Sequence, residues 1–164
     1  MLFRSARARQ TSFAGDQPGL SLDAASSAAE RAVAVAPHLG DSWMALANVK
    51  RNSGDLPGAG RAVREALIRA PSLPAAQEMA GMLLLEAGCI ERGLEHLAAT
   101  RSLDPGNPQP RWDASRGIAL LGRWDEADRM VEAPVGDDSG RAIQVLVRER
   151  YRLWRRSPVG RTRR

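Results

Sequence analysis

Residues 43–71, WMALANVKRNSGDLPGAGRAVREALIRAP, decide the fold. The first half carries apolar residues at helical spacing, and Gly54 follows where a helix needs a left-handed C-terminal residue. A second helical pattern comes next and stops at Pro71, because proline cannot continue a helix. The stretch therefore predicts two helices, at 41–53 and 56–70, joined by a tight turn.

The same arrangement recurs along the chain every 34 residues, which we call one repeat period. The recurring positions hold Pro37, Pro71 and Pro105; Gly54, Gly88 and Gly122; and Ala25, Ala59, Gly93 and Ala127. Because several residue classes keep one period, we interpret the chain as an array of helix-turn-helix repeats. The small residues would let the paired helices approach closely.

The period and the residue classes resemble the tetratricopeptide repeat (TPR), a helix-turn-helix of about 34 residues. Its pattern, W-x2-L-G-x2-Y…A-x3-F…P, is found here as Trp43-x2-Leu46-Ala47-x2-Lys50…Ala59-x3-Val63…Pro71. Most aromatic positions hold aliphatic or polar residues, whereas the small and proline positions are kept. The resemblance covers residues 22–133 and implies an all-α, right-handed α-solenoid of TPR-like repeats.

We predict an array with incomplete ends. The predicted segments are a disordered or truncated leader at 1–21, a half unit at 22–39, units at 40–73 and 74–107, and a shorter unit at 108–133. Pro134 falls inside the position of the last repeat helix, so that helix should end near Ala133. The half unit lacks its first helix, so we expect the chain to begin inside a longer array.

A basic amphipathic helix is predicted at 139–156, followed by a disordered tail at 157–164. One apolar stripe of this helix contains Ile143, Leu146, Val147, Tyr151 and Trp154, and arginines fill much of the rest. We interpret it as a capping helix that covers the last unit with this stripe and does not keep the phase of the repeat. The alternative is that Tyr151, Trp154 and the arginines contact nucleic acid or an anionic membrane, which we disfavour.

The net charge of +5 is unevenly distributed. Residues 10–140 carry 12 basic and 18 acidic groups, whereas residues 141–164 carry nine arginines and one glutamate. The high isoelectric point therefore does not make the repeat region a nucleic-acid-binding face. The chain has no apolar run of membrane-spanning length and no signal-peptide pattern, and its single cysteine, Cys89, excludes an internal disulfide. We therefore predict a cytoplasmic location.

The sequence indicates no catalytic constellation. His38 and His96 lie apart from cysteines and paired carboxylates at ligand spacing, and the glycine-rich turns lack the lysine of a phosphate loop. We predict no enzymatic activity, no cofactor and no metal. One alternative remains open: the chain is the repeat segment of a larger bacterial enzyme, such as a TPR-linked sulfotransferase or glycosyltransferase.

The resemblance implies that a peptide or helix binds on a concave face formed by the first helix of each unit. The residues expected on this face are Met44, Asn48, Arg51, Glu78, Met82, Leu85, Gln109, Trp112 and Arg116. A competing interpretation is that Met82, Leu85 and Trp112 pack between neighbouring units. The expected function is non-catalytic protein binding, as a scaffold or adaptor in a bacterial cytoplasm.

A carboxylate clamp of the type that binds Hsp70 or Hsp90 tails is not expected. Of the positions that form such a clamp only Asn48 fits, and the others hold Met44, Met79, Gln109 and Asp113. Without clustered donors a terminal carboxylate has no strong, charge-assisted site.

Overall fold

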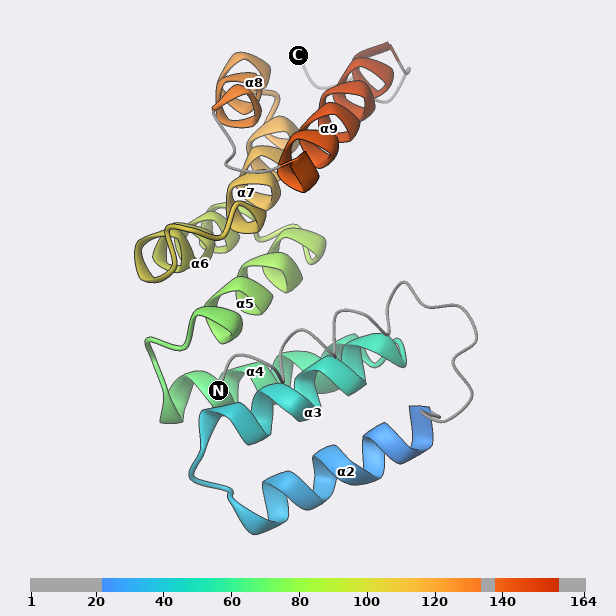
Figure 1. Cartoon of the computed structure of the whole chain (residues 1–164), viewed down its shortest axis with the longest axis vertical. Helices are drawn as coiled ribbons and strands as arrows, with labels where there is room; N and C mark the ends of the chain where they lie inside the picture. The colour runs from blue at the N-terminus through green and yellow to red at the C-terminus, as the bar shows by residue number, and fades with distance from the viewer. Residues whose placement is uncertain (1–21, 134–137, 157–164) are drawn as a thin grey trace. The chain divides into compact units, whose positions relative to one another are not determined.

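The computed structural model describes residues 22–133 and 138–156, which form eight α-helices and no strand (Figure 1). The helices are α2 (Leu22–Val35), α3 (Gly40–Asn52), α4 (Leu56–Arg69), α5 (Pro74–Glu86), α6 (Ile90–Leu103), α7 (Gln109–Leu120), α8 (Trp124–Glu132) and α9 (Asp138–Arg156). The all-α prediction is confirmed. The predictions for residues 1–21 and 157–164 lie outside the described residues.

Three glycines make the turns inside the helix pairs. Gly54, Gly88 and Gly122 have φ angles of 81°, 81° and 77°, a left-handed conformation that side chains with a Cβ rarely adopt. At the first turn the Gly54 N–H donates to the carbonyl of Arg51 at 3.0 Å, and the next N–H donates to that of Lys50 at 2.9 Å. These two bonds close the end of α3, so the predicted capping role of the glycines is confirmed.

The chain divides into two compact units, residues 1–76 and 77–164. In the first unit, α3 packs against both α2 and α4. Small side chains bring these helices together, since Ala47, Ala59 and Ala66 are fully buried. A Cβ added to Gly40 would lie 2.8 Å from the Cβ of Ala70, so α3 and the end of α4 are in close contact there.

In the second unit, two glycines allow α5 and α6 to touch. A Cβ on Gly93 would lie 2.9 Å from the carbonyl oxygen of Gly81, and a Cβ on Gly81 would lie 3.0 Å from that of Gly93. Leu97 is fully buried beside this contact and clusters with Leu85 and Ala114. The predicted close approach at Gly93 is therefore confirmed, and α7 continues the packing against α6.

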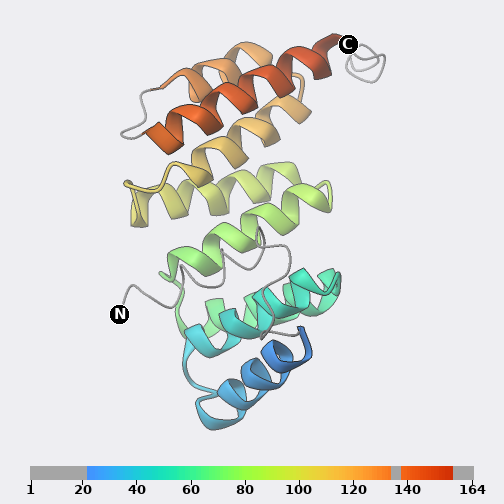
Figure 2. The same cartoon turned by 45° about the vertical axis from the view of Figure 1, so that its right-hand side comes forward.

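Helix α8 ends at Glu132, as the position of Pro134 predicts, and α9 then lies against α7 and α8 (Figure 2). Tyr151 joins a buried cluster with Trp112, Ile118, Ala127, Val131 and Val147. Its hydroxyl is 2.7 Å from the Ser115 hydroxyl. The Trp124 ring stands edge-on to both Tyr151 and Trp154, with ring centroids 6.1 and 5.5 Å apart.

The prediction that the apolar stripe of α9 is buried against the last unit is wrong in part. Val147 and Tyr151 are buried, but Ile143 is 39% and Leu146 is 68% exposed. The buried arc is centred between Val147 and Tyr151, and Leu146 lies about 100° around the helix from Val147. The packing therefore leaves a second apolar arc of α9 exposed.

Candidate peptide-binding face

The candidate face in the second unit is built by α5 and α7, and we call it the first-helix face. It contains Glu78, Met82 and Leu85 from α5, and Gln109, Trp112 and Arg116 from α7. Residues spaced three or four apart share one side of a helix, so each trio is aligned along its helix. Met44, Asn48 and Arg51 hold the corresponding positions on α3 of the first unit.

Burial separates the nine predicted residues into two groups. Met44, Leu85 and Trp112 are only 5%, 3% and 4% exposed, so their side chains contribute to packing. Leu85 belongs to the cluster around Leu97, and Trp112 belongs to the cluster around Tyr151. The half-buried group comprises Asn48 and Arg51 in the first unit, and Glu78, Met82, Gln109 and Arg116 in the second.

Hydrogen bonds fix several of the polar side chains. Glu78 accepts from the Asn107 side-chain amide at 3.0 Å, and the Asn107 side-chain oxygen accepts the Gln109 backbone N–H at 3.0 Å. Asn107 thus joins α5 to the start of α7. The sequence interpretation missed this residue, although an Asn directly before a proline at a turn is a recognisable signal.

Asp113 of α7 is a half-buried carboxyl group that contacts the first-helix face through Gln109. Burial raises the pKa of its carboxyl, and the hydrogen bond from Gln109 and the nearby Arg116 and Arg150 guanidiniums offset part of that rise. The Gln109 amide donates to this carboxylate at 3.1 Å. Arg116 has a buried Nε without a hydrogen-bond partner. Among the described residues, Arg116 and Arg150 form no ion pair with a carboxylate.

We expect Asp113→Asn to raise the midpoint of thermal unfolding at pH 7. Because the folded-state pKa lies above the unfolded value, the wild type loses stability as the pH rises from about 4, the ordinary aspartate range, through the raised pKa. The asparagine removes the buried charge and can still accept from Gln109. Circular dichroism melts at pH 3 to 8 measure the difference between the two proteins.

The difference in melting midpoint should shrink toward low pH, where both side chains are neutral. Asp41→Asn is the matched control, since Asp41 is an exposed carboxylate on α3. A gap between Asp113→Asn and wild type that stays the same at every pH would contradict the buried-charge explanation.

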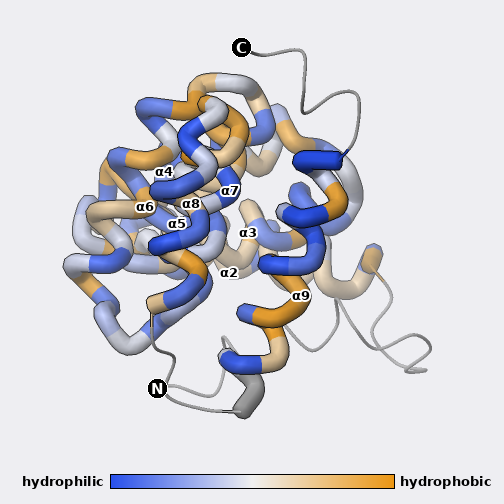
Figure 3. Tube along the Cα trace, turned by 90° about the horizontal axis from the view of Figure 1, so that it is seen from above, coloured by the Kyte–Doolittle hydropathy of each residue, from blue (hydrophilic) through white to orange (hydrophobic). Residues whose placement is uncertain are grey.

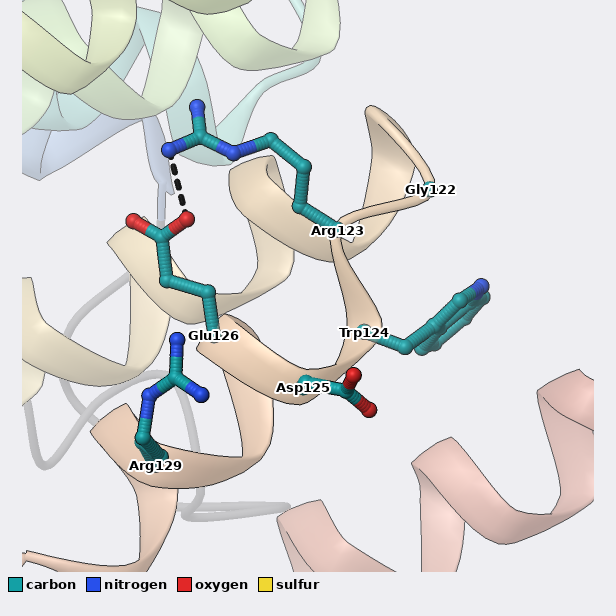
Figure 4. A pocket seen from close by; sticks show the side chains of 6 residues that line it. All are labelled: Gly122, Arg123, Trp124, Asp125, Glu126 and Arg129. Atoms are coloured by element: carbon teal, nitrogen blue, oxygen red, sulfur yellow. Dashed lines mark ion pairs between the residues drawn. The ribbon is translucent and has the colours of Figure 1, made fainter.

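Two surface hollows hold mostly charged side chains. One of about 340 Å³ surrounds the turn from α7 to α8 (Figure 4), where Arg123 pairs with Glu126 and Trp124 points to the other side. A second of about 220 Å³ lies between α8 and α9, where Arg155 pairs with Asp128 at 2.5 Å. Each hollow therefore contains an ion pair between its own side chains, and we assign no ligand to either.

His96 lies within α6, and Cys89 lies directly before it. His96 is half-buried, and its Nδ1 is 2.6 Å from the Gln77 side-chain oxygen. Cys89 is an exposed free thiol at the start of α6. Across residues 22–133 and 138–156, no group of three His, Cys, Asp or Glu side chains is placed to hold a metal ion. None of the described helices is both long and apolar enough to cross a bilayer.

Comparison with known proteins identifies the fold. No protein-family model and no curated protein matches the chain. Among solved structures, YrrB, described as a TPR protein with an unusual peptide-binding site, matches with a TM-score of 0.63 and 21% identity over 80% of this chain and 66% of its own. The fold is of the TPR type. MamA matches with a TM-score of 0.60 and 15% identity, over 79% of this chain and 72% of its own.

The structural similarities concern the fold alone, because the identities are low. In TPR terms α3, α5 and α7 are first helices, and α4, α6 and α8 are second helices. At the positions of a TPR carboxylate clamp, Met44 and Met79 are buried, and Gln109 donates to Asp113. The chain spans only part of the YrrB and MamA structures.

If α9 bound nucleic acid through its aromatic residues, Tyr151 and Trp154 would need exposed rings. Tyr151 is 1% exposed, and Trp154 packs on Trp124. Three arginines of α9 also lie near carboxylates, with Arg148 3.9 Å from Glu132, Arg152 2.5 Å from Glu149, and Arg155 paired with Asp128. The Tyr151 ring therefore serves the packing of α9 and is not available for stacking on bases, and the half-buried Trp154 ring contacts Trp124.

Proposed function

We propose that this TPR-type protein binds a peptide or a helix of a partner protein on the first-helix face, as a scaffold or adaptor without catalysis of its own. The observation that carries the proposal is Arg116, a half-buried guanidinium with an unsatisfied Nε and no ion pair among the described residues. A buried donor without a partner costs free energy, so a ligand that supplies an acceptor gains from meeting it.

The neighbours of Arg116 suit such a ligand. Met82, one repeat period earlier, is half-buried and offers a flexible thioether that adapts to different apolar side chains. Gln109 and Glu78 are already held by hydrogen bonds, so binding need not order them. The peptide-binding site for which YrrB is described supports this kind of ligand. The exposed thiol of Cys89 suits a reducing compartment such as the bacterial cytoplasm.

The proposal predicts that Arg116→Gln weakens binding. The full chain would be screened on an array of random 15-residue peptides, and the strongest binder would be titrated by fluorescence anisotropy. Loss of a charge-assisted hydrogen bond should lower the affinity about 10-fold to 100-fold. The midpoint of thermal unfolding should fall only slightly, because the Arg116 guanidinium lies near the Asp113 carboxylate but forms no ion pair among the described residues.

Arg92→Gln is the matched control, since Arg92 is exposed on α6, a second helix, and should leave the affinity unchanged. An array on which no peptide binds above background would overturn the proposed function. Equal losses of affinity in both variants would place the binding surface elsewhere.

A further inference from the structure

Helix α9 stands in register with α7, although its residue classes do not repeat those of α7. Gly117 of α7 faces the preceding helix pair, because a Cβ on it would lie 2.8 Å from Leu85 of α5. Tyr151 stands one repeat period later and also faces the preceding pair, where it bonds to Ser115 of α7 and packs on Trp124 of α8. By this packing α9 takes the place of a first helix, although its sequence does not keep the phase of the repeat.

The exposed apolar side chains of α9 fall at the positions of the first-helix face. Moving one repeat period along the chain from Gln109, Trp112 and Arg116 leads to Ile143, Leu146 and Arg150, and Leu153 follows on the same side of the helix, three residues after Arg150. Ile143 is 39% exposed, and Leu146 and Leu153 are each 68% exposed. Figure 3 shows hydrophobic and hydrophilic stretches alternating along α9. Apolar side chains that line up on an exposed helix face mark a surface for a partner.

Arg116 and Arg150 lie at the same level on neighbouring helices. Each is adjacent in sequence to one member of the Ser115–Tyr151 hydrogen bond, whose oxygens are 2.7 Å apart. Both guanidiniums are close enough to Asp113 to lower the pKa of its carboxyl, which Glu86 raises in turn. Asp113 is already held by Gln109 and forms no ion pair with either arginine. The two guanidiniums therefore have donors left for another carboxylate.

Building on the peptide-binding function above, we propose that α9 extends the first-helix face and that Arg116 and Arg150 together bind an acidic side chain of the peptide. Aliphatic residues beside that acidic residue pack on Leu146 and Leu153. Charge complementarity favours an acidic peptide, because α9 contains six arginines and only two acidic residues, Asp138 and Glu149. Guanidinium groups bind carboxylates strongly through paired, charge-assisted hydrogen bonds.

The peptide array tests this inference and uses amidated peptides, which carry no terminal carboxylate. We expect the bound peptides to be enriched in Asp or Glu next to Leu, Ile or Val. Arg150→Gln should weaken binding of an acidic peptide about tenfold, with little effect on its glutamine analogue. Leu153→Ser should weaken both peptides, because it removes apolar contact area.

The matched controls lie on another side of the same helix. Arg152 is exposed and paired with Glu149, and Val145 is 56% exposed. Arg152→Gln and Val145→Ser should leave both affinities unchanged. Melting curves of all four α9 variants should agree within about 2 °C, because each changed side chain is exposed.

The outcomes separate this inference from the proposed function. Binding without acidic enrichment, or binding that Arg150→Gln leaves intact, overturns the role of α9 while peptide binding stands. An array without any bound peptide overturns both. Sedimentation with vesicles of phosphatidylcholine and phosphatidylserine that is lost in Leu153→Ser, in the absence of peptide binding, would assign the α9 surface to an anionic membrane instead.

Discussion

The Tyr151→Ala variant is expected to lose about 3–5 kcal/mol of the free energy of unfolding of the second unit. Tyr151 is 1% exposed and packs in the cluster that holds α9 against α7 and α8. Truncation removes the buried ring and leaves a cavity whose walls relax only in part. Urea unfolding followed by tryptophan fluorescence measures the loss, since three of the four tryptophans lie in this cluster or pack on it.

Tyr151→Phe is the matched control for that loss. It keeps the ring but removes the hydroxyl that lies 2.7 Å from the Ser115 hydroxyl. The Ser115 hydroxyl still donates to the carbonyl of Trp112, so the phenylalanine should cost only about 1 kcal/mol. A Tyr151→Ala variant as stable as Tyr151→Phe would mean that α9 does not pack through this side chain.

The repeat fold was predictable because each of its turns depends on local chemistry. Gly54, Gly88 and Gly122 must adopt positive φ angles, and the need for glycine there is visible in the sequence. Pro71 and Pro105 follow helices that must end, for a reason that lies in the proline ring itself. Such constraints involve only neighbouring residues, so a single sequence displays them without knowledge of the packing.

The orientation of α9 was not predictable in the same way. Apolar residues cover a wide arc of this helix, from Leu146 through Ile143 and Val147 to Tyr151. The arc that is buried depends on partners in other helices, namely the Ser115 hydroxyl and the Trp124 ring. The pattern of one amphipathic helix specifies that a face is buried, but the neighbouring helices select which one.

For the proposed binding face, the sequence predicts which positions share one side of a helix but not which of their side chains stay accessible. Register places Trp112 and Arg116 on the same side of α7, yet Trp112 is 4% exposed and Arg116 is half-buried. A large apolar side chain at such a position turns into the cluster beneath it, whereas a guanidinium keeps its donors near water. Arg150 was not proposed for this face from the sequence, because α9 was interpreted as a cap outside the repeat register.

The close contact of α5 and α6 leads to the second large effect. We expect Gly93→Ala to lower the stability of the second unit by about 1–3 kcal/mol, because a new Cβ would meet the Gly81 carbonyl oxygen and Leu85 Cδ2, both at 2.9 Å. A backbone oxygen cannot move aside as a flexible side chain can, so the two helices must separate. Urea unfolding monitored by circular dichroism at 222 nm measures the change.

Gly60→Ala is the control that isolates this steric effect. Gly60 lies inside α4, and a Cβ built on it meets no heavy atom within 4 Å. Alanine there should stabilise the protein by about 0.5–1 kcal/mol, because glycine costs more conformational entropy in a helix. Helix propensity favours alanine over glycine at both sites. If Gly60→Ala raises the free energy of unfolding and Gly93→Ala lowers it, the difference in sign can therefore come only from the contact at Gly93. If Gly93→Ala also stabilised the protein, α5 and α6 would not approach as closely as the Gly81–Gly93 contact requires.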